Sequence, residues 1–191
     1  GLDLLFPHHE SEIAQSVCAF DCEPAKYWLH NNMITIGGQK MGKSLGNFIT
    51  LSEFFSGNHQ KLDKAYSPMT IRFFVLQAHY RSTLDFSNEA LAAAEKGMKK
   101  MFEAQKKIDV LPVADKTSVD FDGVFKKCVE AMCDDFNTPV AIANMFEVCR
   151  LINLVADKKE TISQADKDAL KENFAIVFND ILGMKGEQTD N

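Results

Sequence analysis

Apolar residues recur at intervals of three and four through most of the chain from residue 69 to residue 184, and this periodicity restricts the fold more than any other feature. It predicts five helical segments, four of which begin near residues 68, 88, 121 and 138, while the pattern of the fifth starts at Leu170. Ser67 before Pro68, and Asn137 two residues before Pro139, are typical helix starts. Because helices joined by short connections pack against each other, we expect a mainly α fold with an antiparallel helical bundle.

The apolar stripes identify the side chains expected in the core. They are Ile71, Phe74, Val75 and Ala78; Leu91, Ala94, Met98, Met101, Gln105 and Ile108; Phe121, Val124, Cys128 and Met132; Ile142, Met145, Phe146, Cys149 and Ile152; and Leu170, Phe174, Val177, Phe178 and Ile181. Residues 113–120 form a linker, and residues 186–191 a polar tail.

The first 58 residues differ from the rest, because glycines and prolines interrupt them repeatedly. His8–Ala19 is predicted as a helix that starts after Pro7. Residues 26–30 and 33–36 are predicted as a pair of short strands with Asn31 and Asn32 at the turn. A loop then follows from Gly37 to about Thr50.

Composition excludes several classes of protein. Of 191 residues, 46% are apolar and 25% are charged, which is ordinary for a globular chain, and the net charge of −6 argues against a wholly basic nucleic-acid-binding surface. A local basic patch is compatible with that total. No run of about 18 apolar residues is present, so no membrane-spanning helix is expected. Five cysteines without C-x2-C spacing favour reduced thiols and a cytoplasmic location.

The chain begins at Gly1 and its first methionine is Met33, which suggests a fragment of a longer protein.

His8 and Glu12 are the first candidate site. They lie four residues apart, so a helix places the imidazole and the carboxylate on one face, where both can bind one zinc ion. A solvated helix face is the commoner reason for such a pair, and two donors do not complete a tetrahedral site. Cys18 and Cys22 lie about 9 Å or more from His8 along the helix axis, and we expect them to be small buried apolar side chains.

Residues 40–47, Lys-Met-Gly-Lys-Ser-Leu-Gly-Asn, are the second candidate site and are called the lysine loop below. Two lysines flank a glycine here, so the loop can present ammonium donors to a polyphosphate. It lacks the upstream glycine of the phosphate-cradling G-x-x-x-x-G-K-[ST] pattern. Most sequences with this lysine spacing are solvated turns.

Read together, these segments resemble cysteinyl-tRNA synthetase, a class I aminoacyl-tRNA synthetase. The resemblance rests on Phe-Pro-His-His-Glu-x-Glu-Ile-Ala-Gln-Ser at residues 6–16, Tyr-Trp-Leu-His-Asn at 27–31 and the lysine loop. Ala-His-Tyr-Arg-Ser at 78–82 and Asp-Phe-Asn-Thr-Pro at 135–139 are also similar, so the resemblance extends from Gly1 to about Gly183.

The resemblance implies roles for the two candidate sites. His8 and Glu12 match two zinc ligands of the family, and the family's zinc binds the substrate thiolate and so distinguishes cysteine from serine. Lys40, Lys43 and Ser44 match the mobile catalytic loop Lys-Met-Ser-Lys-Ser, in which the second lysine, Lys43 here, binds the ATP phosphates. Gly42 replaces the usual serine, at a modest cost in backbone freedom.

The resemblance also implies the reaction and the partners. Cysteine and ATP, the latter with Mg2+, give cysteinyl-adenylate and pyrophosphate, and the cysteinyl group then passes to tRNA(Cys). Residues 1–58 correspond to the end of a Rossmann-type α/β catalytic domain. Residues 59–112 correspond to connecting helices that contact the tRNA stem, and residues 113–191 to an anticodon-binding type of bundle.

The family's other two zinc ligands and its His-Ile-Gly-His segment are expected in a missing N-terminal half, so this chain is expected to be inactive alone. Two alternatives are a cysteine–amino-sugar ligase of thiol biosynthesis and a non-enzymatic RNA-binding helical module. The long helical region disfavours the first, and the two candidate sites disfavour the second.

His79 and Arg81 are expected to form surface hydrogen bonds. For five lysines we expect first a solvated helix face and second a contact with the tRNA backbone. These are Lys96, Lys99, Lys100, Lys106 and Lys107.

Overall fold

The structure is a computed structural model that describes residues 1–186. The predicted polar tail at 186–191 therefore falls almost entirely outside the described residues. The chain forms two compact units, the first from Gly1–Thr50 with Tyr80–Ser87, the second from Leu51–His79 with the chain from Asn88 onward.

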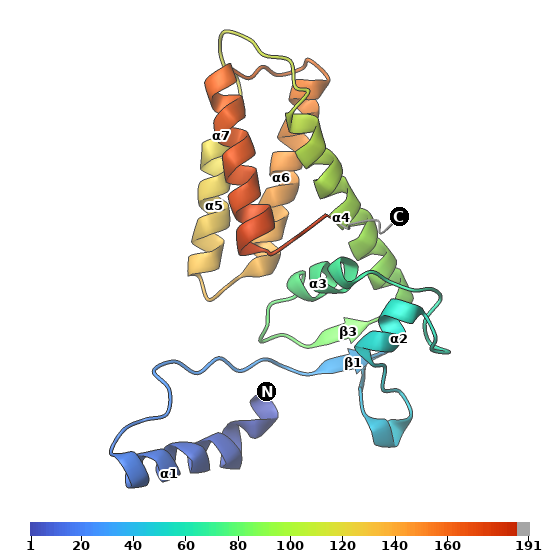
Figure 1. Ribbon diagram of the computed structural model, residues 1–191, viewed down its shortest axis with the longest axis vertical. Helices are drawn as coiled ribbons and strands as arrows, with labels where there is room; N and C mark the ends of the chain where they lie inside the picture. Colours follow the sequence, from blue (N-terminus) through green and yellow to red (C-terminus); the bar gives the residue numbers. More distant parts are fainter. Residues whose placement is uncertain (187–191) are drawn as a thin grey trace. The chain divides into compact units, whose positions relative to one another are not determined.

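The second unit is helical, and the five helices predicted from the apolar periodicity are present, whereas a short helix at residues 51–56 was not predicted. Its helices are α2 (Leu51–Ser56), α3 (Pro68–Leu76), α4 (Asn88–Ile108), α5 (Phe121–Cys133), α6 (Thr138–Ala156) and α7 (Gln164–Phe174), and a π-helical segment, Ala175–Ile181, continues α7. Figure 1 shows α4, α5, α6 and α7 running alongside one another. Four residues connect α5 to α6, so these two helices pack as an antiparallel pair.

Side-chain caps begin the bundle helices. Ser67 accepts a hydrogen bond from the Thr70 N–H at the start of α3, and Asn137 accepts one from the Val140 N–H at the start of α6. Each cap satisfies one of the backbone donors that a helix leaves unpaired in its first turn. Both predicted helix starts are confirmed.

Burial confirms most of each predicted stripe and corrects a few positions. In α4, Leu91, Ala94, Met98, Met101 and Ile108 are buried, whereas Gln105 is not and Ala104 is buried beside it. The Gln105 amide needs a polar partner and donates to Asn179 Oδ1 at 2.7 Å.

Three further segments differ from their predicted stripes. In α5, Phe125 and Ala131 are buried rather than the adjacent Val124 and Met132. In α3, Phe73 is fully buried whereas Val75 is 44% exposed. In the segment after α7, Ile181 is 39% exposed.

By length and composition, α6 is long and apolar enough to cross a membrane. The expectation of no such helix considered only unbroken apolar runs, and α6 contains no such run of about 18 residues. Within residues 1–186 it is the one helix that meets this criterion. Eight of its residues are buried and it packs against α4 and α5, as a core helix does.

The first unit contains a small three-stranded sheet. Strand β1 (Ile34–Ile36) lies in the centre, with β2 (Gln39–Lys40) antiparallel on one side and β3 (Leu84–Phe86) parallel on the other. Figure 1 shows β1 and β3 side by side. Gly37 and Gly38 form the β1–β2 turn with φ of +58° and +76°, a conformation that favours glycine.

The predicted strand at residues 26–30 is wrong, although the strand over 33–36 is confirmed in its central part. Residues 26–30 join no ladder, and the Asn32 N–H donates instead to the Tyr80 carbonyl at 2.9 Å. The hairpin turn lies at Gly37–Gly38 rather than at the two asparagines, because both turn residues there take positive φ.

The helix α1 (Glu10–Phe20) follows a π-helical turn, Leu5–His9, and confirms the predicted first helix with its boundaries shifted. None of its residues is buried within the described chain, and Phe20 is 77% exposed. Cys18 and Cys22 are exposed too, so the expectation that they are buried is wrong.

Candidate functional site

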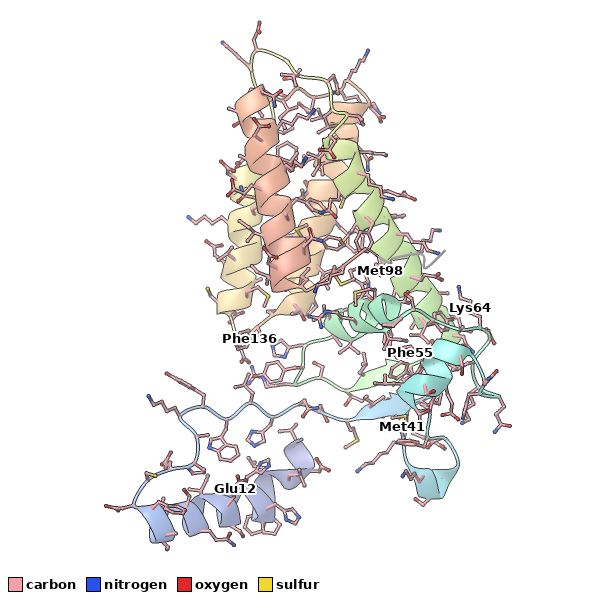
Figure 2. All side chains as sticks on the ribbon, viewed as in Figure 1. Glu12, Met41, Phe55, Lys64, Met98 and Phe136 are labelled. Atoms are coloured by element: carbon pink, nitrogen blue, oxygen red, sulfur yellow. The ribbon has the colours of Figure 1, made fainter. Side chains whose placement is uncertain are left out.

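The lysine loop leaves the sheet at β2 and folds into a compact turn. Lys40 ends β2, the Met41 N–H donates to the Ile34 carbonyl at 3.1 Å, and Lys43–Leu45 form one turn of 3-10 helix. Gly46 closes that turn with φ of +64°. Figure 2 labels Met41, which locates the loop. The structure therefore brings all three predicted catalytic residues into one short segment.

Lys40, Lys43 and Ser44 are all exposed, as a group that meets a solvent-borne phosphate must be. The Lys43 ammonium lies over the Phe48 ring, 5.5 Å from its centroid. A cation held on an aromatic face keeps most of its charge available and is held only weakly, by about 0.5–1 kcal/mol at an exposed site. Lys43 is thus restrained in a position from which it can leave readily.

Asn47 lies at the end of the lysine loop and is only 2% exposed. Its Oδ1 accepts the Gly42 N–H at 2.9 Å, and its Nδ2 donates to the Lys40 carbonyl at 3.1 Å. The side chain therefore ties two backbone groups across the loop. No role for Asn47 was predicted from the motif, although its amide, which can both donate and accept, was a signal present in the sequence.

Asp85 fixes the hairpin from which the lysine loop leaves. Its Oδ1 accepts hydrogen bonds from the Thr35 hydroxyl at 2.6 Å and from the Gly38 N–H at 2.9 Å. These bonds, the Thr35 one first, lower the pKa of the Asp85 carboxyl, because both favour its ionised form. Asp85 was not predicted as part of the site, because its partners are distant in sequence.

His8 and Glu12 occupy the approach to α1, with Glu12 on its first turn (Figure 2). Only Phe6 departs from helical dihedral angles in the preceding turn, so the backbone is helical from His8 to Glu12. The predicted shared face is compatible with this backbone, and both side chains are exposed.

An imidazole and a carboxylate are suitable zinc donors, and this pair fits half of a four-coordinate site. Within residues 1–186 no group of three or more His, Cys, Asp or Glu side chains is arranged to hold a metal ion. Cys18 and Cys22 do not complete the site, and its zinc role stays a prediction.

Beside this pair, three rings form a cluster that the sequence analysis did not predict. His9 lies 5.1 Å from Trp28 and 5.0 Å from His30 between ring centroids, and Trp28 stacks on His30 with an interplanar angle of 9°. His9 Nδ1 and His30 Nε2 are 2.9 Å apart, so one of them donates a hydrogen bond to the other. The cluster attaches the segment after α1 to its first turn.

His79 and Asp135 join two helix ends in the helical unit. His79 Nε2 lies 3.8 Å from Asp135 Oδ2, and the nearby Thr138 hydroxyl donates to the Leu76 carbonyl at 2.7 Å. The His79–Asp135 contact and the Thr138 hydrogen bond join the end of α3 to the α5–α6 turn. In the other unit, the Arg81 guanidinium lies over the Tyr80 ring, 5.9 Å from its centroid. The surface role expected for His79 and Arg81 fits these contacts.

The lysines of α4, Lys96, Lys99, Lys100, Lys106 and Lys107, are all exposed, as predicted. Between α4 and α6 a groove of about 420 Å³ is lined by Lys100, Lys107 and Arg150, together with Glu103 and uncharged residues. Arg150 pairs with Glu147 at 2.6 Å and the Lys107 ammonium donates to Asn153 Oδ1 at 2.7 Å. The groove is thus basic, although nearby carboxylates neutralise part of its positive charge.

Two family models match the chain. Residues 1–96 match the catalytic domain of class I (C) tRNA synthetases, and residues 127–185 match the DALR domain. The first match includes both candidate sites, and the second includes α6 and α7.

Curated relatives have one name in common. Proteins named cysteine–tRNA ligase from Parabacteroides distasonis and Porphyromonas gingivalis are 57% and 55% identical to this chain, over 98% of it. One from Chlorobium chlorochromatii is 41% identical over 96% of it. The chain spans only 38% of the length of the first two relatives.

A solved structure shares the fold. It is the ternary complex of LeuRS, tRNA and LeuAMS from Agrobacterium radiobacter K84, with a TM-score of 0.63 and 14% identity over 94% of this chain and 24% of the other. This neighbour confirms the expected combination of a helical bundle with a small α/β part. By its family-model match and by its similarity to these relatives, the chain belongs to the cysteinyl-tRNA synthetase family of class I tRNA synthetases.

Proposed function

We propose that this chain is the part of a cysteine–tRNA ligase that carries the lysine loop, two of the zinc donors and an RNA-binding helical bundle. The observation that carries the proposal is the lysine loop, which presents the exposed Lys40, Lys43 and Ser44 on a turn anchored to a sheet. The names of the relatives support it.

In the proposed reaction, a carboxylate oxygen of cysteine attacks the α-phosphorus of ATP and pyrophosphate leaves. Negative charge shifts onto the departing pyrophosphate, and an ammonium there stabilises the transition state more than the ground state. Lys43 supplies that charge. Lys40 and Ser44 hold the loop and its phosphate contacts. The cysteinyl group then passes from the adenylate to the terminal adenosine of tRNA(Cys).

Zinc fits this proposal as a group that His8 and Glu12 hold together with donors from elsewhere in the complete ligase. When bound, zinc supplies selectivity, since a thiolate is a far better ligand for it than the hydroxyl of serine. Because residues 1–186 bring no group of three or more donors together, the 191-residue chain alone should bind zinc weakly.

The helical unit is proposed to bind tRNA. The α4–α6 groove presents Lys100 and Lys107, and phosphate contacts require local positive charge rather than a basic protein. The match to the DALR domain supports this role and disfavours the amino-sugar ligase, which has no anticodon to recognise. A cytoplasmic location follows from the same proposal.

The test uses the complete ligase, with the isolated 191-residue chain as comparison. We expect cysteine-dependent ATP–pyrophosphate exchange and charging of tRNA(Cys) by the complete ligase, with serine a much poorer substrate. The isolated chain should support neither reaction, because part of the nucleotide and zinc sites lies outside it. Exchange that needs an amino sugar as acceptor, or no cysteine-dependent exchange by the complete ligase, contradicts the proposal.

A further inference from the structure

Asn47 has the geometry of a clasp for the lysine loop. Its side-chain amide bridges the Gly42 N–H and the Lys40 carbonyl, two residues apart, and so closes the loop around the peptide of Met41. Only a side chain with both a donor and an acceptor in one plane makes this reciprocal pair. The two bonds also fix the amide orientation, since a reversed amide would face donor to donor and acceptor to acceptor.

The lysine loop needs such a clasp for conformational reasons. It contains Gly42 and Gly46, which allow more backbone conformations than other residues, and its catalytic side chains are exposed and make few fixed contacts. Gly42 immediately precedes Lys43, so the direction in which Lys43 leaves the backbone depends on the Gly42 conformation. The bond from Asn47 to the Gly42 N–H restricts that conformation.

The burial of Asn47 makes the clasp strong. The residue is 2% exposed, so water competes little for its amide, and loss of one partner would leave a buried polar group unpaired. Within residues 1–186, the restraint found on the exposed side chains of Lys40 and Lys43 is the Phe48 contact of Lys43.

We propose that Asn47 is a positioning residue for adenylate formation, which acts through Lys43 and does not itself touch ATP. The inference rests on the proposed function of the lysine loop. The structural part, that Asn47 holds the Gly42 N–H, is independent of that function and can be measured separately.

The first experiment measures the clasp directly in the complete ligase. Backbone amide hydrogen exchange, resolved to single residues by mass spectrometry, is compared between the unsubstituted enzyme and Asn47→Ala. The Gly42 amide should exchange about tenfold faster in Asn47→Ala, as expected for the loss of one hydrogen bond. The Met41 amide, which is bonded to the Ile34 carbonyl, should change less. Unchanged exchange at Gly42 overturns the clasp.

The second experiment tests the coupling to Lys43 by single-turnover adenylation. Asn47→Ala should slow adenylation by ~10- to 100-fold, the scale expected for misplacing a catalytic group by about 1 Å, with little change in KM for ATP or cysteine. Gln39→Ala is the matched control, because Gln39 is an exposed amide in β2 beside the loop and should leave the rate unchanged.

The decisive measurement is the double variant Lys43→Ala/Asn47→Ala. If Asn47 acts through Lys43, the double variant should be no more than about twofold slower than Lys43→Ala alone, since coupled residues are not additive. A full additional loss in the double variant indicates general damage and overturns the proposal. If the complete ligase shows no cysteine-dependent exchange, the proposed function fails while the Gly42 result still decides the clasp.

Discussion

Thr35 and Asp85 face each other across the parallel strands β1 and β3, with the Thr35 hydroxyl 2.6 Å from Asp85 Oδ1. The same carboxylate oxygen accepts the N–H of Gly38 in the β1–β2 turn. The side chain of Asp85 therefore holds both strand β1 and the β1–β2 turn, which lead into the lysine loop. The loop begins two residues after that turn.

The pKa of Asp85 should be measurably low and should depend on Thr35. Carbon-detected NMR titration should place the Asp85 pKa below the ordinary value of about 3.9, and Thr35→Val should raise it, because the largest cause of the shift is lost. The stabilisation is complete above the unfolded-state pKa and disappears as pH falls through the lower folded-state pKa. An unchanged Asp85 pKa in Thr35→Val contradicts the assignment.

Lys43→Ala should slow adenylation in the complete ligase without much change in KM. Removing one well-placed charged donor commonly costs ~2.7–4 kcal/mol, or roughly 10²–10³ in rate, when the interaction belongs to the transition state. Lys40→Ala should have a smaller effect. Pre-steady-state kinetics on both variants checks this. A change confined to KM for ATP in Lys43→Ala would show that the loop only binds the ground state.

His8→Ala should act on cysteine rather than on ATP. Loss of the imidazole removes a zinc donor, so KM for cysteine should rise and the zinc content of the complete ligase should fall. Glu10→Ala is the matched control. Glu10 is also exposed and lies two residues after His8, so it points to a different face of the helix. Equal effects of the two substitutions on zinc content would exclude a specific ligand role for His8.

The five cysteines should divide by reactivity into two classes. Burial raises the pKa of Cys128 to about 11 and that of Cys149 to about 12, so little thiolate forms at pH 8, whereas Cys18, Cys22 and Cys133 are exposed. Brief alkylation with iodoacetamide and peptide mass spectrometry should label the exposed three, and the buried two only after denaturation. Rapid native labelling of Cys149 would contradict its position in the core.

Ser67→Ala should destabilise the helical unit by about 1 kcal/mol, because the cap on the Thr70 N–H is lost. Urea unfolding followed by circular dichroism measures the change. Ser67→Asp is the matched control, since a carboxylate also caps helices and suits the positive end of the helix dipole. Equal losses in both variants would indicate that Ser67 contributes by packing and not as a cap.

The local features of the helical unit were predictable from sequence alone. Caps such as Ser67 and Asn137, and stripes such as Leu91, Ala94, Met98 and Met101, involve residues three or four apart, so the chain carries their geometry within one helix. The errors are displacements of one position, as in Phe125 for Val124 and Ala131 for Met132. They arise because the buried face also depends on which neighbouring helix covers it.

The candidate site was only partly predictable, because some of its contacts join residues that are distant in sequence. Lys40, Lys43, His8 and Glu12 stand out as motifs within a few residues, and the family match followed from their order. The roles of Asp85 and of the His9–Trp28–His30 cluster could not be predicted from such motifs. The partners of Asp85 lie 47 and 50 residues away in sequence, and the two histidines are 21 residues apart.

The sequence by itself determined the five helices from residue 68 onward, the caps at Ser67 and Asn137, the exposed lysine loop and the family to which the chain belongs. Only the tertiary structure decided that β1 pairs with residues 39–40 and 84–86 rather than 26–30, and that Asn47 and Asp85 hold the loop. Strand pairs and side-chain clasps join segments that are distant in sequence or need a specific turn. Their selection depends on which pairing satisfies the most buried polar groups in the folded chain, and no short stretch of sequence contains that information.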